Sequence, residues 1–599
     1  MKIIIDNVNA LVEFDNETEK QAEWLCDYLH RSIDILDPDR FHQASFIRYR
    51  TWDGYTKNAV KNKDGNLVVK TGLISKMYKA IARLQEKAPS VRYTVKDIRG
   101  DRIEPCEEIP EKIYLDSGSE DSSFYLHDYQ REQVVTIFNE QRGYILSAVN
   151  SGKSAVAYET FKLAVPNLDS DDIALFIAPN KNIEKQMLKN MALYLDYPIG
   201  EWADGVKDIQ KVTVATIQTI ASAIKKPEIK VTSRKDILLT HIATVYSKDI
   251  IDSVNPRSTL RHLIRNFVIE YKYQKKELEY LSELYNSLNN DEEVRETFVG
   301  FNNQYRELVD RLSGGKATKY WDAISVLKRV KVLFVDEVQH AGSTSYKNVL
   351  GLMNNARMRI GMSGTVPKSK ENDINAYLGD QLSDITNDSM IKMGVSTPIS
   401  IIPVVYNTPD NLEEIVTNEM AEANVPVDNG LFRYQFVNRI GIVENSSRNK
   451  YIAELATKLS DLNNGAVYIA FNNIEHGENI AEFLDELGTD YVIMQGSTSD
   501  EERQEILKGL VSGDVRVILG SKVLDEGVSV PTLKYLLYVS GGQSEIQVGQ
   551  RVGRILRLGS GKERVYVYDF QDHNSTFLYK HAKARMKLYK QENYPIIDI

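Results

Sequence analysis

The sequence has 599 residues, of which 42% are hydrophobic and 26% charged, and its formal net charge is −10. This length exceeds what one hydrophobic core supports, so two to four domains are expected, and the acidic balance argues against a passive basic nucleic-acid coat protein. Two cysteines exclude a disulfide framework, no apolar run approaches membrane-spanning length, and the N-terminus turns acidic too soon for a signal peptide. We therefore expect a cytoplasmic protein without membrane contact.

Residues 1–115 are predicted to form a small α+β accessory domain. Strands or helices are expected at 3–5, 17–36, 67–70 and 73–87 from the spacing of apolar residues. A basic and aromatic segment around Arg50 and Trp52 lies between them. This segment fits a DNA-contacting module, but it equally fits a solvated domain with Trp52 in a small core.

A polar stretch at 116–123, D-S-G-S-E-D-S-S, is predicted to be a linker. The apolar run 143–146 then leads into S-A-V-N-S-G-K-S at 147–154 and a helical pattern. Strand, small-residue loop, Gly-Lys-Ser and helix are typical of a phosphate-binding loop, whose N–H groups converge on an anion. Lys153 is expected at the β- and γ-phosphates and the Ser154 hydroxyl on Mg²⁺. Asn150 replaces a usual glycine, and asparagine tolerates the left-handed conformation.

The apolar runs 173–178 and 212–216 alternate with helical patterns, which predicts a doubly wound parallel sheet. Such sheets bind ligands where their strands end. The alternation of apolar runs and helical patterns stops at about 226–320, where long charged segments carry leucines at helical spacing. We interpret this range as a helical insertion.

The strand 330–335 runs into Asp336-Glu337-Val338-Gln339-His340. Two adjacent carboxylates at a sheet edge suit Mg²⁺-dependent hydrolysis of ATP, with Asp336 on the metal and Glu337 polarising the attacking water. Ser363-Gly364-Thr365 follow a further apolar stretch, and their hydroxyls are expected to sense the state of the γ-phosphate.

A second α/β unit is predicted from residue 391, with strands at 466–471, 515–519 and 535–539. A helix beginning near 547 carries Gln550, Arg554 and Arg557. The two arginines lie three apart and are predicted to share one helix face, where two guanidinium forks suit a polyphosphate. A basic and aromatic helix is expected at 577–594.

These motifs stand in the order used by superfamily 2 helicases and translocases, and the chain most resembles the bacteriophage UvsW-type helicases of that superfamily, which act on branched DNA. Support comes from R-T-W-D-G at 50–54, T-G-L-I at 71–74 and S-S-R-N-K-Y-I-A at 446–453. The resemblance implies RecA-like lobes at 116–390, with the insertion, and 391–599. The second motif departs from the DExH form, because Gln339 holds its fourth position and His340 comes one residue later. Either residue is a candidate for the histidine role.

The resemblance also assigns roles to individual residues. The catalytic set is Lys153, Asp336, Glu337, Gln550, Arg554 and Arg557. The nucleotide-binding set is Gln130, at the adenine edge, with Asn150, Ser151, Gly152, Lys153, Ser154 and Gly527. Ser154 and Asp336 would hold Mg²⁺, Ser363, Gly364 and Thr365 would couple the lobes, and Thr216, Gln218, Arg50 and Trp52 would contact nucleic acid.

The function implied is that of an ATP- and Mg²⁺-dependent DNA helicase or translocase, which moves on branched, forked or duplex DNA in recombination, replication or repair. We expect a monomeric motor in the host cytoplasm, with single-strand-binding or recombination proteins as partners. Two alternatives stay open: the duplex-translocating motor subunit of a restriction-type complex, and a nucleotide-gated DNA clamp with weak ATPase activity. The substitutions at Ser147 and Asn150 motivate the clamp, and DNA-stimulated ATP turnover separates it from a motor.

Overall fold

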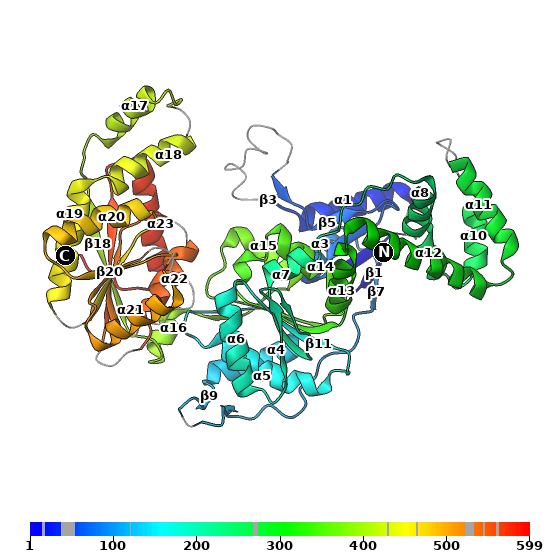
Figure 1. Ribbon diagram of the computed structural model, residues 1–599, viewed down its shortest axis with the longest axis horizontal. Helices are drawn as coiled ribbons and strands as arrows, with labels where there is room; N and C mark the ends of the chain where they lie inside the picture. Colours follow the sequence, from blue (N-terminus) through cyan, green and yellow to red (C-terminus); the bar gives the residue numbers. More distant parts are fainter. Residues whose placement is uncertain are drawn as a thin grey trace. The chain divides into compact units, whose positions relative to one another are not determined.

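The computed structural model describes three large β-sheets with their helices, two small two-stranded sheets and a helical unit (Figure 1). The described residues are 1–14, 18–36, 54–119, 121–267, 274–427, 430–462, 465–496, 498–520, 532–542, 545–558 and 562–598. Two compact units are present: Thr219–Lys328, and the rest of the chain on either side of it.

The N-terminal domain is a five-stranded sheet covered by two helices. Its strands, in sheet order, are β5 (Ala59–Lys61), β6 (Leu67–Lys70), β2 (Asn9–Glu13), β1 (Lys2–Ile5) and β7 (Thr94–Asp97). The helices are α1 (Glu19–Ile33) and α3 (Ile74–Lys87). Strand residues alternate between buried and partly exposed in β1, β2 and β6, because only one face packs on the helices.

This domain is docked tightly on the next one. A Cβ atom at Gly72 would lie 1.8 Å from the carbonyl oxygen of Asn375, so only glycine permits this approach. Ala376, the next residue of α15 (Lys368–Tyr377), belongs to the buried core of the N-terminal domain. Lys76 Nζ also donates to Asn372 Oδ1 at 2.6 Å, so this lysine is engaged in docking.

Lobe 1 is built on an eight-stranded sheet that is parallel except for one hairpin. Its strands, in sheet order, are β13 (Val206–Lys207), β12 (Ile199–Ala203), β14 (Val212–Thr216), β11 (Ile173–Ala178), β15 (Val330–Val335), β16 (Met358–Ser363), β10 (Arg142–Ser147) and β17 (Gln381–Ile385). Every residue of β11, β14 and β16 is buried. Both faces of the sheet are therefore covered, as expected for parallel strands joined through helices.

The helices of lobe 1 connect successive strands. They are α4 (Asp128–Glu140), α5 (Lys153–Ala164), α6 (Lys181–Tyr194), α7 (Ile217–Ala223), α14 (Thr344–Leu352), α15 and α16 (Asn387–Lys392). α4, α5 and α6 pack on one face of the sheet through a large apolar cluster that includes Val134, Phe161 and Met187.

The predicted linker at 116–123 needs correction. It is the loop of a hairpin between β8 (Tyr114–Leu115) and β9 (Phe124–Tyr125). Ile113 and Leu115, which precede it, are buried in the lobe 1 core, so packing with lobe 1 begins before residue 116. Its serines and Asp116 hydrogen-bond one another within the loop, which accounts for the polar composition.

The second unit, Thr219–Lys328, is helical and has a core of its own. Its α-helices are α8 (Arg234–His241), α9 (Ser247–Ile251), α10 (Pro256–Arg265), α11 (Gln274–Ser287), α12 (Asp291–Ser313) and α13 (Lys316–Lys328). Leu260, Leu281, Val294 and Phe298 are fully buried at its centre. The leucine spacing seen in the sequence is thus used for an internal core.

Lobe 2 is a six-stranded, wholly parallel sheet. In sheet order the strands are β18 (Ile399–Tyr406), β23 (Val565–Asp572), β22 (Leu533–Tyr538), β19 (Ala466–Ala470), β21 (Val517–Gly520) and β20 (Tyr491–Met494). One face is covered by α19 (Ser446–Asp461) and α20 (Ile474–Glu486). The other is covered by α21 (Asp500–Ser512), α22 (Glu545–Ile555) and α23 (Thr576–Gln591). Two further helices, α17 (Leu412–Glu422) and α18 (Gly430–Asn438), follow β18.

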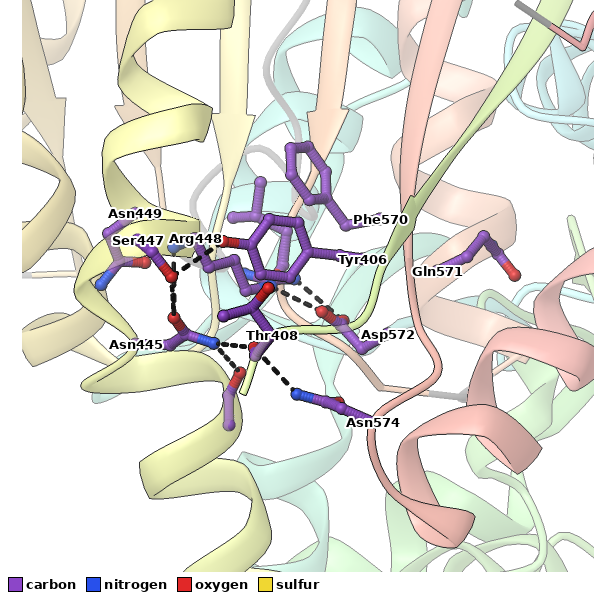
Figure 2. A network of polar contacts seen from close by, with 12 residues as sticks. Tyr406, Thr408, Asn445, Ser447, Arg448, Asn449, Phe570, Gln571, Asp572 and Asn574 are labelled. Carbon is purple, nitrogen blue, oxygen red and sulfur yellow. Dashed lines mark hydrogen bonds and ion pairs between the residues drawn. The ribbon is translucent and has the colours of Figure 1, made fainter. Parts of the chain in front are cut away.

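Buried ion pairs join the helices of lobe 2 to β23. Arg448, at the start of α19, donates to both carboxylate oxygens of Asp572 at 2.7 and 3.0 Å, and neither side chain is exposed (Figure 2). The Arg448 guanidinium also lies over the ring of Phe570. A second pair, Arg585 with Asp569, is equally buried. These pairs fix α19 and α23 at the carboxyl end of β23, because a buried charge that loses its partner is strongly destabilising.

The predicted fold class, an α/β protein with two tandem lobes built on mainly parallel sheets, a small N-terminal domain and a helical insertion in the first lobe, is confirmed. Among the helices of the described ranges, none is both long and apolar enough to cross a membrane.

Candidate nucleotide site

The loop between β10 and α5 has the geometry of a phosphate-binding loop. Asn150 has φ 74° and Gly152 has φ 72°, so both take the left-handed conformation expected from the sequence. Gly152 is the N-cap of α5, and the helix amino end therefore opens beside the loop. Lys153 Nζ donates to the carbonyl oxygens of Ser147 at 3.0 Å and Ala148 at 3.3 Å. The loop thus folds around its own lysine at the end of β10.

Side chains of helix α4 hold this loop in place through hydrogen bonds. Gln130 Nε2 donates to the Ser151 carbonyl at 2.9 Å, and its Oε1 accepts from the backbone N–H of His127 at 2.8 Å. The Tyr129 hydroxyl donates to the same Ser151 carbonyl at 2.9 Å. In this structure, therefore, the amide of Gln130 contacts the loop itself.

Gln133 is a contact that sequence reasoning missed. It lies three residues after Gln130 and donates to Ser147 Oγ at 2.6 Å and to Ser383 Oγ at 3.0 Å. The i, i+3 spacing from Gln130 is the signal that identifies it.

Asp336 and Glu337 follow directly from the end of β15. The pKa of Asp336 is raised to about 7, chiefly by burial and then by the Glu337 carboxylate, while the charge of Lys153 opposes the shift. Glu337 itself has φ 49°, a conformation that turns the chain sharply after the strand. Two adjacent carboxylates with little compensating charge favour a cation, and hard oxygen donors suit Mg²⁺.

Gln339 links this carboxylate pair to the next strand. Its Nε2 donates to Glu337 Oε2 at 2.5 Å, and its Oε1 accepts from Ser363 Oγ at 2.5 Å. Ser363 Oγ in turn accepts from the Thr365 N–H at 3.1 Å. His340 is exposed, whereas Gln339 is buried. Of the two residues left open by the sequence, Gln339 is the one that joins the two motifs.

Thr216 and Gln218 lie at the carboxyl edge of the same sheet, where β14 is separated from β15 by one strand, β11. Thr216 ends β14 and is buried, while Gln218, at the start of α7, donates to the Pro179 carbonyl after β11 at 2.7 Å. The side chain of Gln218 therefore joins the ends of β11 and β14. These strand ends lie at the carboxyl edge of the sheet, the edge at which β10 leads into the phosphate loop.

The expectation that Arg554 and Arg557 share one helix face is wrong. α22 ends at Ile555, and the Thr397 N–H and hydroxyl donate to the carbonyls of Leu556 and Arg557, which holds them outside the helix. Arg557 Nε donates to Asn150 Oδ1, and Asn150 Nδ2 donates to the Gly553 carbonyl at 2.9 Å. Arg557 and the phosphate loop are thus brought together.

Several predicted site residues fall outside what the structure describes. Arg50, Trp52 and Gly527 are not in the described ranges, and Gln550 and Arg554 are described only as backbone of α22. Gly364 lies near Val149 of the phosphate loop. A Cβ atom added at Gly364 would lie 3.5 Å from Val149 Cγ2, which is an ordinary van der Waals contact. Ser154 contacts the hydroxyl of Tyr158.

Two family models match the chain, one on each lobe. Residues 123–368 match the family described as type III restriction enzyme, res subunit, and residues 448–559 match the helicase conserved C-terminal domain. The ordered motifs on the two sheets and these two matches agree. Together they support a superfamily 2 helicase.

Two relatives of this superfamily 2 chain are viral. The ATP-dependent DNA helicase uvsW of Enterobacteria phage T4 is 24% identical over 278 residues, 43% of this chain and 52% of that protein. Putative helicase 22 of a Sulfolobus islandicus filamentous virus is 24% identical over 270 residues, 45% of this chain and 47% of the relative. The matched regions span about half the length of these relatives. The crystal structure of T4 UvsW aligns with a TM-score of 0.37 and 17% identity, covering 100% of this chain and 99% of that one.

Proposed function

We propose that this chain is an ATP- and Mg²⁺-dependent DNA translocase or helicase. The observation that carries the proposal is the arrangement at the carboxyl edge of the lobe 1 sheet: Lys153 stands near Asp336, and Gln339 joins Glu337 to Ser363. Superfamily 2 membership supports ATP with a divalent metal as the cofactors.

Each residue of the edge has a role in this proposal. Lys153 and the backbone N–H groups at the start of α5 bind the phosphates, because the helix amino end and the ammonium both favour negative charge. Ser154 and Asp336 hold Mg²⁺, which neutralises charge on the phosphates when it is bound. Glu337 orients and polarises the attacking water. Arg557 stabilises the charge that develops in the transition state, a contribution worth roughly 10³–10⁵ in turnover in related chemistry.

Gln339 couples this chemistry to the rest of the lobe. Its two hydrogen bonds make the position of the Glu337 carboxylate depend on Ser363, which ends β16. We propose that the nucleic-acid track lies at Thr216 and Gln218, which belong to the same edge of this sheet. We place DNA first among substrates, from the likeness to the phage T4 protein, which is named a DNA helicase. Branched or forked DNA is proposed from the resemblance of the sequence motifs to the UvsW-type helicases.

A second candidate is a duplex translocase that does not separate strands. It is favoured by the match of residues 123–368 to a restriction-enzyme subunit family. The two are separated by measuring ATP turnover on single-stranded, duplex, forked and four-way DNA, together with strand displacement on the forked substrate. Turnover stimulated by duplex without strand displacement would favour the translocase, and turnover unaffected by every DNA would refute both.

A further inference from the structure

Arginines gather where the N-terminal domain meets lobe 1, on the side of the lobe 1 sheet where its strands begin. Arg142 is the first residue of β10, and Arg357 immediately precedes β16. Arg99 and Arg102 follow β7, the edge strand of the N-terminal sheet. The phosphate loop and Asp336 lie where the strands end, so this cluster is separate from the nucleotide site.

Side-chain and backbone hydrogen bonds hold the segments of this cluster together. Asn7 Nδ2 donates to the carbonyl of Arg99 at 3.1 Å and to that of Asn354 at 3.0 Å, which joins the end of the N-terminal sheet to the turn before Arg357. Arg142 Nη2 donates to the Asn7 carbonyl at 2.6 Å. The positions of the arginines are therefore fixed by the fold.

Positive charge in the cluster is only partly balanced. The Arg99 side chain donates three hydrogen bonds to Asp97, at 2.9, 3.1 and 2.6 Å. Arg102 donates to the carbonyl of Phe138 at 2.9 Å and lies 3.5 Å from the Glu104 carboxylate, so two carboxylates face the three arginines Arg99, Arg102 and Arg357. Within the described part of the chain, Arg357 Nε is shielded from solvent and has no hydrogen-bond partner. The pKa of Arg357 is lowered by burial and then by the charges of Arg99 and Arg102.

A cation crowded by two others is destabilised by their charge. An anion beside the guanidinium groups of Arg99, Arg102 and Arg357 would relieve this repulsion. Guanidinium forks match phosphate oxygens better than a point charge does. Phosphate is therefore the ligand chemistry that this cluster fits.

We propose that Arg99, Arg102 and Arg357 bind the phosphate backbone of duplex DNA. This inference rests on the proposed function and adds to it a DNA contact away from the edge that carries Gln218. The Tyr78 and Tyr93 rings stack on each other with centroids 6.0 Å apart, so each ring has one face occupied by the other. The arginines supply charge, and charge recognises the phosphate backbone, which a duplex carries on its outside.

The test is the salt dependence of duplex binding by Arg357→Gln in the full chain. Arg357 donates none of the hydrogen bonds described above, so this variant removes charge with little other loss. Each phosphate contact contributes about 0.9 to the slope of log affinity against log salt on B-DNA. The ratio of the variant's Kd to that of the wild type should therefore fall about threefold between 50 and 200 mM salt. Arg31→Gln, an exposed arginine of α1, is the matched control and should leave the slope unchanged.

An unchanged slope for Arg357→Gln, or an equal change for Arg31→Gln, would overturn the inference. Arg357→Lys keeps the charge and should keep the slope, so a loss of slope there would point to a packing defect and also overturn it. A slope change seen with duplex RNA and absent with duplex DNA would refute DNA as the partner. The rate of ATP hydrolysis by Arg357→Gln at saturating DNA should equal that of the wild type. If DNA does not stimulate ATP hydrolysis by the wild-type chain, the proposed function itself is refuted.

Discussion

The hydrogen bonds of Gln339 allow a quantitative prediction about turnover. Gln339→Leu keeps the side-chain volume but removes the donor to Glu337 and the acceptor for Ser363. A hydrogen bond to a charged group contributes about 1.5–3 kcal/mol, and each 1.36 kcal/mol in the barrier is tenfold in rate. If Glu337 is positioned chiefly by this donor, kcat for ATP should fall roughly 10- to 100-fold, while the affinity for ATP changes little.

The assay is steady-state ATP hydrolysis with saturating DNA, beside nucleotide binding measured by equilibrium titration. Ser363→Ala removes only one of the two contacts and should give a smaller loss. His340→Ala is the neighbouring control, since His340 is exposed, and it should retain turnover. Wild-type kcat in Gln339→Leu, or a loss confined to His340→Ala, would show that the histidine and not the glutamine fills the motif's fourth role.

Four further outcomes are expected. Lys153→Ala should abolish hydrolysis and weaken ATP binding, whereas Glu337→Gln should retain binding and lose turnover; equal loss of affinity in both contradicts the assignment. Arg557→Ala should lower kcat far more than ATP affinity, and an unchanged kcat would move that role elsewhere. Burial raises the pKa of Glu184 to about 7, so between its unfolded value of 4.5 and 7 the folded state binds more protons and stability falls as pH rises. Glu184→Gln should therefore raise the melting temperature at pH 8 but not near pH 5, and a gain independent of pH would refute this. Arg448→Met leaves a buried carboxylate unpaired and should lower amide protection in β23 by about 3–5 kcal/mol in hydrogen exchange.

Strand ends were predictable because each apolar run is followed at once by its polar motif. The runs before Lys153 and Asp336 became β10 and β15 within a residue or two of the expected limits. The helix face of Arg557 was not predictable, because the hydrogen bonds that hold Arg557 outside α22 come from Thr397, far away in the sequence. Local spacing carries no information about such a partner.

Two other features could not be predicted from the sequence and became clear only from the structure. The polar composition of 116–123 is the same for a linker and for a hairpin loop, and the pairing of Tyr114 with Tyr125 that decides between them is set by packing on lobe 1. Likewise Gln339 and His340 are adjacent and both polar. Only the direction of the chain after the left-handed Glu337 turns Gln339 inward and leaves His340 in solvent.

The close approach of Gly72 to α15 has a mechanical consequence. Because the carbonyl of Asn375 lies against Gly72 and Ala376 completes the core of the N-terminal domain, that domain cannot move away from α15 without exposing part of its own core. Under the proposed function, a load that DNA places on the N-terminal domain would therefore reach the lobe whose sheet carries the phosphate loop.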